Sequence, residues 1–348
     1  MTRAVRFSRY GGPDVLQILE VPDPVPGPGE VLVGVVAVGL NPVEAAIREG
    51  RFDAEWPARF PVGQGSDFAG IVRQLGVGVS GWKVGDEVMG HTVRGSQAEL
   101  VAVPATDIVR KPDSLAWEVA GSLYVAGANA WRAVQDVNPH PGRTVLVHAA
   151  AGGVGGIAAQ LARLRGATVI GTAGPESFDR LRQLGVVPVE YGPGLAARLA
   201  RLAPNGIDAE LDHLGDDSLA NLRSADTTET VLLAKIARMV ADRQIVVPVA
   251  AIYPFDQVQD AYRELEAGHA HGKIVLSLHP VGYARQKVRG VDVRESEATR
   301  DEPGRVAGPP AHEVLPPVFG HPRKHPADRA TEFTPASAPV RADSGLVP

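Results

Sequence analysis

The chain has 348 residues, a hydrophobic content of 44% and a formal net charge of −5 at pH 7. This length allows two domains, and the mildly acidic balance argues against partners such as nucleic acid or an anionic membrane. The sequence holds no cysteine, which excludes disulfides and thiolate chemistry. Its start lacks a signal-peptide core and its longest apolar run, residues 31–40, is about half a membrane span, so we expect a cytoplasmic protein.

Residues 1–118 are rich in short strands that alternate with glycine turns, a pattern typical of a small barrel-like domain. Asn41 and Pro42 predict a short helix that ends near residue 49, because asparagine favours the cap and proline the first helical position. The predicted strands cover residues 4–7, 15–21, 30–38, 71–75 and 96–103.

The strongest pattern lies in residues 143–166. An apolar run at 144–148 predicts a buried strand, a turn of small residues follows, and a helical pattern then continues to Gly166. A second strand is expected at 167–172. This strand–helix–strand unit is where a dinucleotide's pyrophosphate binds in Rossmann folds.

The glycine template of such turns fits at Ala150, Gly152 and Gly155, with alanine in the first position. Without a Cβ, Gly152 lets the backbone approach a phosphate, and Gly155 lets the helix lie close to the strand. Gly153 and Val154 open the helix, whose free N–H groups and dipole favour an anion. We therefore predict a dinucleotide site here; the alternative is a glycine turn that serves packing alone.

The choice of dinucleotide depends on the end of the second strand, where Thr172 and Gly174 stand and where NAD sites usually place a carboxylate. A missing carboxylate favours NADP, because nothing there would repel a 2′-phosphate. The nearest basic residue is Arg180, on the following helix, and its alternative role is an ordinary solvated charge.

The residues that follow, from 186 onward, predict that the parallel sheet continues. Residues 186–191 form a strand whose Pro188 suits a sheet edge, as expected of the third strand in the order 3-2-1-4-5-6. After a strand at 207–212, the stretch that follows Leu222 is too short for the usual further strands. Residues 231–242 are helical or begin with a remnant strand, strands follow at 245–250 and 274–278, and the proline-rich residues 281–348 are expected to be disordered.

Five motifs together resemble the medium-chain dehydrogenase/reductase superfamily, in the NADPH-dependent quinone oxidoreductase branch that includes zeta-crystallin. They are Gly39-Leu40-Asn41-Pro42-Val43-Glu44, Gly65-Ser66-Asp67-Phe68-Ala69-Gly70, Val84-Gly85-Asp86-Glu87-Val88, the turn around Gly152, and Gly272-Lys273-Ile274-Val275-Leu276. The resemblance implies an α/β chain. A GroES-like catalytic domain (1–118 and 245–280) would be joined to a shortened, doubly wound Rossmann NADP-binding domain (119–244) and a disordered tail (281–348).

The resemblance also implies roles for single residues. Asn41 would lie beside the nicotinamide, although it also caps a helix, and Asn129 replaces a threonine that contacts the cofactor in relatives. Tyr191 matches a tyrosine near the adenosine phosphate, with an ordinary edge-strand aromatic as the alternative. Lys273 would reach the cofactor or serve the structure alone.

The implied activity is zinc-independent hydride transfer from NADPH to a quinone or an enone-type carbonyl compound, with Asn41 and Asn129 as the catalytic positions. Zinc members of the superfamily use cysteine and a Gly-His-Glu turn, whereas this chain has no cysteine and has Gly65-Ser66-Asp67. The implied partner is a small molecule, and a homodimer is compatible with the family. The short region after Leu222 leaves a second hypothesis open, an NADPH-binding protein without catalysis.

Overall fold

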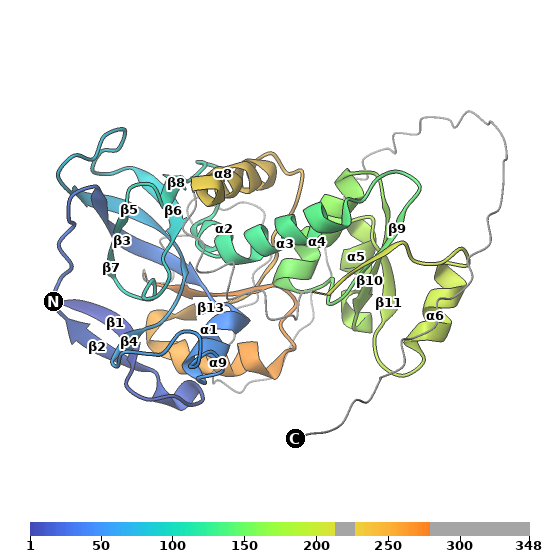
Figure 1. Ribbon diagram of the computed structural model, residues 1–348, viewed down its shortest axis with the longest axis horizontal. Helices are drawn as coiled ribbons and strands as arrows, with labels where there is room; N and C mark the ends of the chain where they lie inside the picture. The colour runs from blue at the N-terminus through green and yellow to red at the C-terminus, as the bar shows by residue number, and fades with distance from the viewer. Residues whose placement is uncertain (213–226, 279–348) are drawn as a thin grey trace, which may run out of the picture. The chain divides into compact units, whose positions relative to one another are not determined.

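A computed structural model of the chain describes residues 1–212 and 227–278. They form three β-sheets with helices between the strands (Figure 1), two of them in a β-rich part and the third a parallel sheet, which confirms the expected α/β class. The expected tail at 281–348, and most of the short stretch after Leu222, lie outside the described residues. Within those residues, no helix combines the length and apolar character needed to cross a bilayer.

The largest sheet joins strands from distant parts of the sequence. Its order is β13-β14-β3-β5-β6-β8, and β7 also pairs with β3. Strand β14 runs antiparallel to β3, with Val275 opposite Gly39, so the end of the described chain completes a sheet begun near its start. The strands are β3 (Glu30–Gly39), β5 (Asp67–Leu75), β6 (Glu87–His91), β7 (Leu100–Pro104), β8 (Ile108–Arg110), β13 (Val249–Pro254) and β14 (Lys273–Ser277).

A smaller sheet has the order β2-β1-β4, from Gln17–Val21, Thr2–Phe7 and Val62–Gly63. The strand expected at 15–21 begins later, because Pro13–Val15 forms a 3₁₀ turn (η1) that proline initiates. Helix α1 (Pro42–Arg48) starts at Pro42 with Asn41 as its cap, as the sequence predicts.

Four parallel strands form the third sheet, in the order β11-β10-β9-β12. These are Val187–Glu190, Thr168–Ala173, Thr144–Val147 and Ala209–Leu211. Since β9 is the first strand of this unit, the order is 3-2-1-4. Pro188 therefore lies on an edge strand, as predicted.

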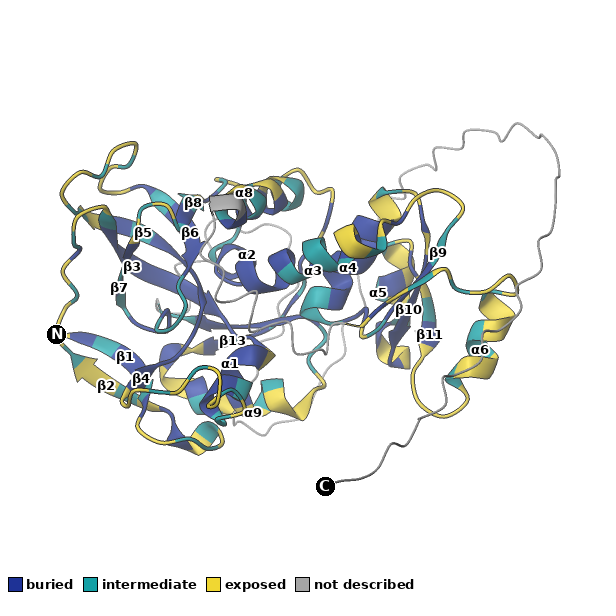
Figure 2. Ribbon diagram, viewed as in Figure 1, coloured by how far each residue is buried: buried dark blue, intermediate teal, exposed yellow. Residues whose placement is uncertain are grey.

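Helices pack around this parallel sheet to different depths. Helix α3 contacts α4, and α4 is largely buried through Ile157, Ala158 and Leu161, whereas α6 has no buried residue (Figure 2). The other helical segments are α2 (Trp117–Ala120), α3 (Tyr124–Val137), α4 (Gly153–Leu164), η2 (Pro175–Ser177), α5 (Phe178–Gln183), α6 (Leu195–Leu202), α8 (Thr227–Ala241), η3 (Phe255–Gln257) and α9 (Val258–Ala267).

Two expectations for the later chain are resolved. Residues 231–233 belong to α8, so the helical interpretation is right and the remnant strand is wrong. The strand expected at 245–250 is also wrong over its first four residues, since β13 begins at Val249. The reason is partly a contact with a distant residue: the Gln160 side chain accepts the N–H of Val246 and donates to its carbonyl, each at 2.8 Å. In addition, Pro248 has no N–H to offer a neighbouring strand.

Candidate functional site

The glycine turn ends in a helix start that no side chain caps within the described residues. Helix α4 begins at Gly153, its cap residue Gly152 is extended, and no side chain caps it. Ala149 adopts a left-handed conformation with φ of 46°, and its carbonyl accepts the Gly152 N–H at 2.8 Å. The first N–H groups of a helix have no acceptor within it, so Gly153, Val154 and Gly155 present donors together with the positive end of the dipole.

Strand β10 fixes the shape of this turn. The Thr172 hydroxyl oxygen accepts the Ala149 N–H at 3.0 Å, and the Thr172 carbonyl accepts the Ala150 N–H at 2.9 Å. Thr172 and Ala150 are both buried. In this structure Thr172 therefore holds the turn in place through two hydrogen bonds, a role its sequence position alone does not reveal.

Close packing accounts for Gly155. A Cβ built there would lie 2.4 Å from the Ala149 carbonyl oxygen and 2.7 Å from that of His148, distances that no real side chain tolerates. The same construction at Gly152 and Gly156 gives 3.2 and 3.3 Å to the nearest backbone oxygen. Gly155 thus brings the helix against the strand end, as expected, while the phosphate-binding role of the turn stays a prediction.

Arg180 reaches back to this turn. Its Nη2 donates to the Ala151 carbonyl at 2.8 Å and its Nη1 donates to the carbonyl of His271. Burial lowers the pKa of the guanidinium. The side chain is thus held beside the turn and is not the freely solvated helix charge considered from the sequence.

A carboxylate does lie at the end of β10. A Cβ on Gly174 would stand 2.0 Å from Oε1 of Glu176, so this carboxylate folds back over the strand end. The same oxygen lies 3.3 Å from Nε2 of His271. The sequence predicts that no carboxylate stands at the end of this strand, and that prediction is wrong. The 3₁₀ turn η2 folds back, so the side chain of Glu176 lies against the end of β10.

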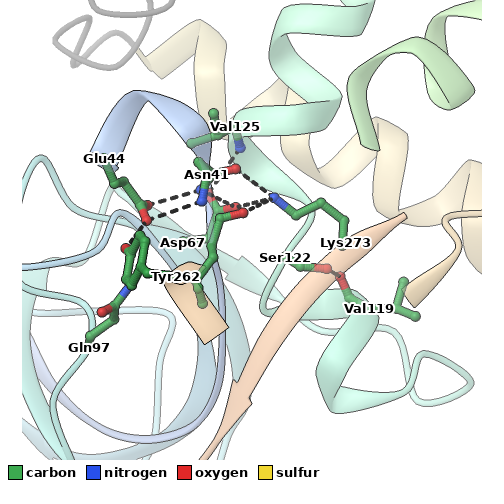
Figure 3. Close-up of polar contacts among 10 residues, drawn as sticks. Asn41, Glu44, Asp67, Gln97, Val119, Ser122, Val125, Tyr262 and Lys273 are labelled. Atoms are coloured by element: carbon green, nitrogen blue, oxygen red, sulfur yellow. Dashed lines mark hydrogen bonds and ion pairs between the residues drawn. The ribbon is translucent and has the colours of Figure 1, made fainter. Parts of the chain in front are cut away.

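A second feature is a group of buried polar side chains, which we call the Asn41 cluster: Asn41, Glu44, Asp67, Tyr262 and Lys273 (Figure 3). None of the five is more than 4% exposed. They come from α1 and its cap, the start of β5, α9 and the start of β14. The largest sheet, which holds β5 and β14, therefore brings together residues from both ends of the described chain.

Lys273 links this cluster to the glycine turn. Its Nζ donates to Oδ1 of Asn41 at 2.5 Å and to the Leu40 carbonyl at 2.8 Å, and lies 3.9 Å from Oδ2 of Asp67. Its Cδ lies 2.9 Å from the point where a Cβ on Gly153 would stand. The aliphatic stem of Lys273 thus packs on the first residue of α4 while its ammonium group contacts Asn41.

Asn41 bridges the two carboxylates. Its Nδ2 donates to Oε1 of Glu44 at 3.0 Å and to Oδ2 of Asp67 at 3.2 Å, and its backbone N–H donates to Oε2 of Glu44 at 3.2 Å. The Tyr262 hydroxyl donates to that same Oε2 at 2.7 Å. Asn41 therefore has its N–H donors engaged inside the protein.

Two outer groups donate further hydrogen bonds into the network. The backbone N–H of Val125 donates to Oδ1 of Asp67 at 3.0 Å, and Nε2 of Gln97 donates to the Tyr262 hydroxyl oxygen at 2.8 Å (Figure 3). Buried polar groups are costly unless they are paired, so this degree of satisfaction is what allows the cluster to exist in the core.

Burial shifts the protonation of the cluster. It raises the pKa of Asp67 to about 6, despite the opposing charge of Lys273, and it raises the pKa of Glu44. It also lowers the pKa of Lys273. Two carboxylates share one ammonium group, and the shifts favour the retention of a proton among them in mildly acidic solution.

The remaining predicted residues lie elsewhere. Asn129 is in α3, a helix whose Gly127 lies against α8, since a Cβ there would stand 3.1 Å from Cδ1 of Ile236. Tyr191 follows edge strand β11 and is 61% exposed. The structure brings Lys273 and Asn41 together, whereas Tyr191 is exposed after an edge strand of the parallel sheet.

Sequence reasoning did not single out Glu44, Asp67 or Tyr262 as members of a site. The spacing Asn-x-x-Glu at 41 and 44 is a capping-box pattern and could have paired the first of them with Asn41. Tyr262 lies 218 positions from Glu44, and no local pattern announces that contact. Over the described ranges, no group of three or more histidine, aspartate or glutamate side chains is placed to hold a metal ion.

Comparison with protein-family models matches each part of the fold. Residues 27–113 match the alcohol dehydrogenase GroES-like domain, and residues 164–276 match the zinc-binding dehydrogenase family. The first match covers β3 to β8 and the second covers the parallel sheet after α4 and the return to β14.

Two curated proteins are similar in sequence to this chain. The chain is 40% identical over 184 residues to a quinone oxidoreductase of Mus musculus, covering 52% of this chain and 55% of that protein. It is 35% identical over 226 residues to the Homo sapiens synaptic vesicle membrane protein VAT-1 homolog, covering 63% of this chain and 57% of that protein. The aligned region thus spans little more than half the length of these relatives.

Solved structures extend the likeness over four fifths of the chain. The quinone oxidoreductase of Escherichia coli, solved in complex with NADPH, is 25% identical with a TM-score of 0.69, covering 80% of this chain and 100% of that one. An NAD-dependent alcohol dehydrogenase is 27% identical with a TM-score of 0.71 and the same coverage. The two domain matches, these relatives and the shared architecture support the resemblance to the medium-chain dehydrogenase/reductase superfamily and its quinone oxidoreductase branch.

Proposed function

We propose that this protein is an oxidoreductase that transfers a hydride from NADPH to a quinone or an enone-type carbonyl acceptor. The observation that carries the proposal is the uncapped start of α4 behind Gly152, joined to the Asn41 cluster by Lys273. An anion site next to a rigid polar cluster is what a dinucleotide needs at its pyrophosphate and nicotinamide ends.

The residues present fit such a cofactor. The N–H groups of Gly153, Val154 and Gly155 would hold the pyrophosphate, and the missing side chain at Gly152 leaves room for the phosphate oxygens. The bound nicotinamide supplies the hydride. The protein's contribution is to bind and orient the two reactants and to exclude water, while Lys273 keeps Asn41 fixed beside the turn.

NADPH is proposed over NADH because a guanidinium, that of Arg180, is held at the turn. Glu176 works in the opposite direction, since its carboxylate at the end of β10 would repel a 2′-phosphate and accept a hydrogen bond from a ribose hydroxyl. Initial rates with each cofactor decide between them. A higher kcat/KM for NADPH supports the proposal, and a higher value for NADH refutes this part of it.

The proposed reaction does not use zinc. At the Gly-Ser-Asp turn, Asp67 is committed to the Val125 N–H, to Asn41 and to Lys273. A quinone is already electrophilic, and addition of one hydride from the cofactor and one proton from solvent yields the hydroquinone. Turnover that survives exhaustive dialysis against a chelator, with no zinc by elemental analysis, is expected; loss of turnover that added zinc restores would overturn this.

A second candidate is a protein that binds NADPH without turning it over. The observation that favours it is the full use of the N–H donors of Asn41 by Glu44 and Asp67, which leaves none for a nicotinamide. Binding measured by the fluorescence of NADPH, combined with no oxidation by a panel of quinones and enones, would select this candidate over the first.

The domain division and the assembly state stay proposals. We propose that residues 1–118 and 245–280 form the catalytic domain around 119–244, because β14 completes the sheet of β3 and β5. The family resemblance favours a homodimer. Light scattering coupled to gel filtration would give twice the monomer mass of 36.6 kDa for a dimer.

A further inference from the structure

His91 is a buried histidine outside the Asn41 cluster, and one of its ring nitrogens is unpaired. It is the last residue of β6 and is 3% exposed. Its Nδ1 is buried and has no hydrogen-bond partner within residues 1–212 and 227–278. A buried polar atom without a partner is unfavourable and rare in folded proteins, so a hydrogen-bonding group on a bound molecule would stabilise it.

The largest sheet places His91 beside the Asn41 cluster. In the antiparallel pairing of β5 with β6, His91 stands directly opposite Asp67. Side chains of directly opposed residues point to the same face of a sheet, with their Cβ atoms about 5 Å apart. Asp67 in turn accepts a hydrogen bond from Nδ2 of Asn41 at 3.2 Å and lies 3.9 Å from Nζ of Lys273. His91 is therefore one strand away from the position proposed for the nicotinamide.

Tyr124 fixes the plane of the His91 ring. The two rings are stacked, with centroids 3.9 Å apart and an angle of 12° between their planes. The residue after Tyr124 is Val125, whose backbone N–H donates to Oδ1 of Asp67 at 3.0 Å, so α3 holds the stack against β5. Stacking occupies a face of the imidazole, and Nδ1 lies at the ring edge, where its direction is fixed by the stack.

The surroundings of His91 favour an uncharged ring. Burial lowers the pKa of the imidazole, although the charges of Asp107 and Glu229 oppose this shift. Glu229 is itself paired with Arg132 and accepts a hydrogen bond from the Tyr124 hydroxyl at 3.4 Å. At pH 7 the ring is therefore neutral, with one N–H donor and one acceptor nitrogen.

We propose that Nδ1 of His91 donates a hydrogen bond to the carbonyl oxygen of the quinone or enone acceptor, an inference that rests on the proposed function. As the electron pair of the hydride enters the conjugated acceptor, negative charge develops on this oxygen, and a donor fixed in place beforehand stabilises it. Solvent still supplies the proton that completes the product, so His91 stays neutral. A hydrocarbon of the same shape has no acceptor atom for Nδ1 and should gain nothing from His91.

Substitutions at His91 separate the donor from the ring. His91→Phe keeps a flat ring against Tyr124 without a donor, His91→Asn places an amide N–H close to the position of Nδ1, and His91→Gln places it close to that of Nε2. With NADPH and menadione, kcat/KM should fall at least tenfold in His91→Phe and His91→Gln but less than threefold in His91→Asn. The dissociation constant of NADPH should change less than twofold throughout, and His140→Phe, at an exposed histidine, is the matched control.

Binding without turnover gives an independent measurement. With NADP⁺ in place of NADPH, quenching of tryptophan fluorescence should show that menadione binds the wild type at least fivefold more tightly than it binds His91→Phe. The carbonyl-free analogue 2-methylnaphthalene should bind both proteins equally, because it offers Nδ1 no acceptor.

The outcomes distinguish this inference from the proposed function. Wild-type turnover with an equal kcat/KM in His91→Phe, equal losses in His91→Asn and His91→Gln, or equal binding of menadione by the wild type and His91→Phe overturns the inference and leaves the reductase function standing. A wild type that binds NADPH and oxidises none with any acceptor refutes the proposed function, and the inference with it. Melting temperatures show which variants fold; if His91→Phe does not, the comparison of His91→Asn with His91→Gln decides.

Discussion

The Cδ atom of Lys273 lies 2.9 Å from the position that a Cβ on Gly153 would take, while its Nζ lies 2.5 Å from Oδ1 of Asn41. One side chain thus joins the first residue of α4 to the cap of α1. The sheet makes this possible, because β14 begins at Lys273 and pairs with the end of β3, one residue before Leu40.

Removal of the Lys273 ammonium group should lower the free energy of unfolding. Lys273→Met leaves Asp67 and Glu44 buried without a counter-charge, and breaking a buried ion pair from one side costs about 3 kcal/mol or more. Urea unfolding monitored by circular dichroism should show this loss, with Lys83→Met at an exposed turn as the control. Unchanged stability of Lys273→Met would mean that the ammonium group does not sustain the cluster.

The glycines of the turn should differ in their tolerance of alanine. Gly155→Ala brings a Cβ within 2.4 Å of a backbone oxygen, so we expect loss of dinucleotide binding and a destabilisation of about 2 kcal/mol. Gly156→Ala meets the nearest oxygen at 3.3 Å and should retain most of the affinity. Fluorescence titration with NADPH ranks the two variants, and equal affinities would show that α4 need not lie so close to β9.

The raised pKa of Asp67 should make the free energy of unfolding depend on pH. Its pKa is raised from 3.8 to about 6 in the folded protein, so the folded state binds more protons than the unfolded state between these values. The contribution of Asp67 to the free energy of unfolding therefore falls as pH rises from about 4 to about 6, by up to about 3 kcal/mol, and no longer changes above that. The difference between wild type and Asp67→Asn in urea unfolding isolates this contribution; a difference that does not vary with pH contradicts it.

Cofactor preference should respond to Glu176. Glu176→Gln removes a carboxylate from the end of β10, so kcat/KM for NADPH should rise relative to that for NADH by about tenfold, the equivalent of ~1.4 kcal/mol. Asp179→Gln, an exposed acid three positions later, is the matched control. An unchanged ratio would indicate that the carboxylate does not face the ribose.

The sequence predicts well those features that depend on local pattern. The turn from Ala150 to Gly155, the cap at Asn41 and the edge strand with Pro188 all follow from residue types at fixed spacing. Each is decided by backbone constraints that a short stretch of sequence carries by itself.

Other features depend on contacts between distant residues, and the sequence could not reveal them. Residues 245–248 have an apolar pattern typical of a strand, but the side chain of Gln160 takes both hydrogen-bonding groups of Val246. Glu176 reaches the strand end only because η2 folds back. Tyr262 joins Glu44 because α9 packs beside α1, a tertiary contact without a local signature.

The most direct test of the account is a crystal structure of the full chain grown with NADPH. We expect the pyrophosphate at the N–H groups of Gly153, Val154 and Gly155, and the nicotinamide next to Asn41 and Lys273. A dinucleotide bound elsewhere, or a glycine turn that stays filled by the protein's own side chains at saturating NADPH, would contradict it.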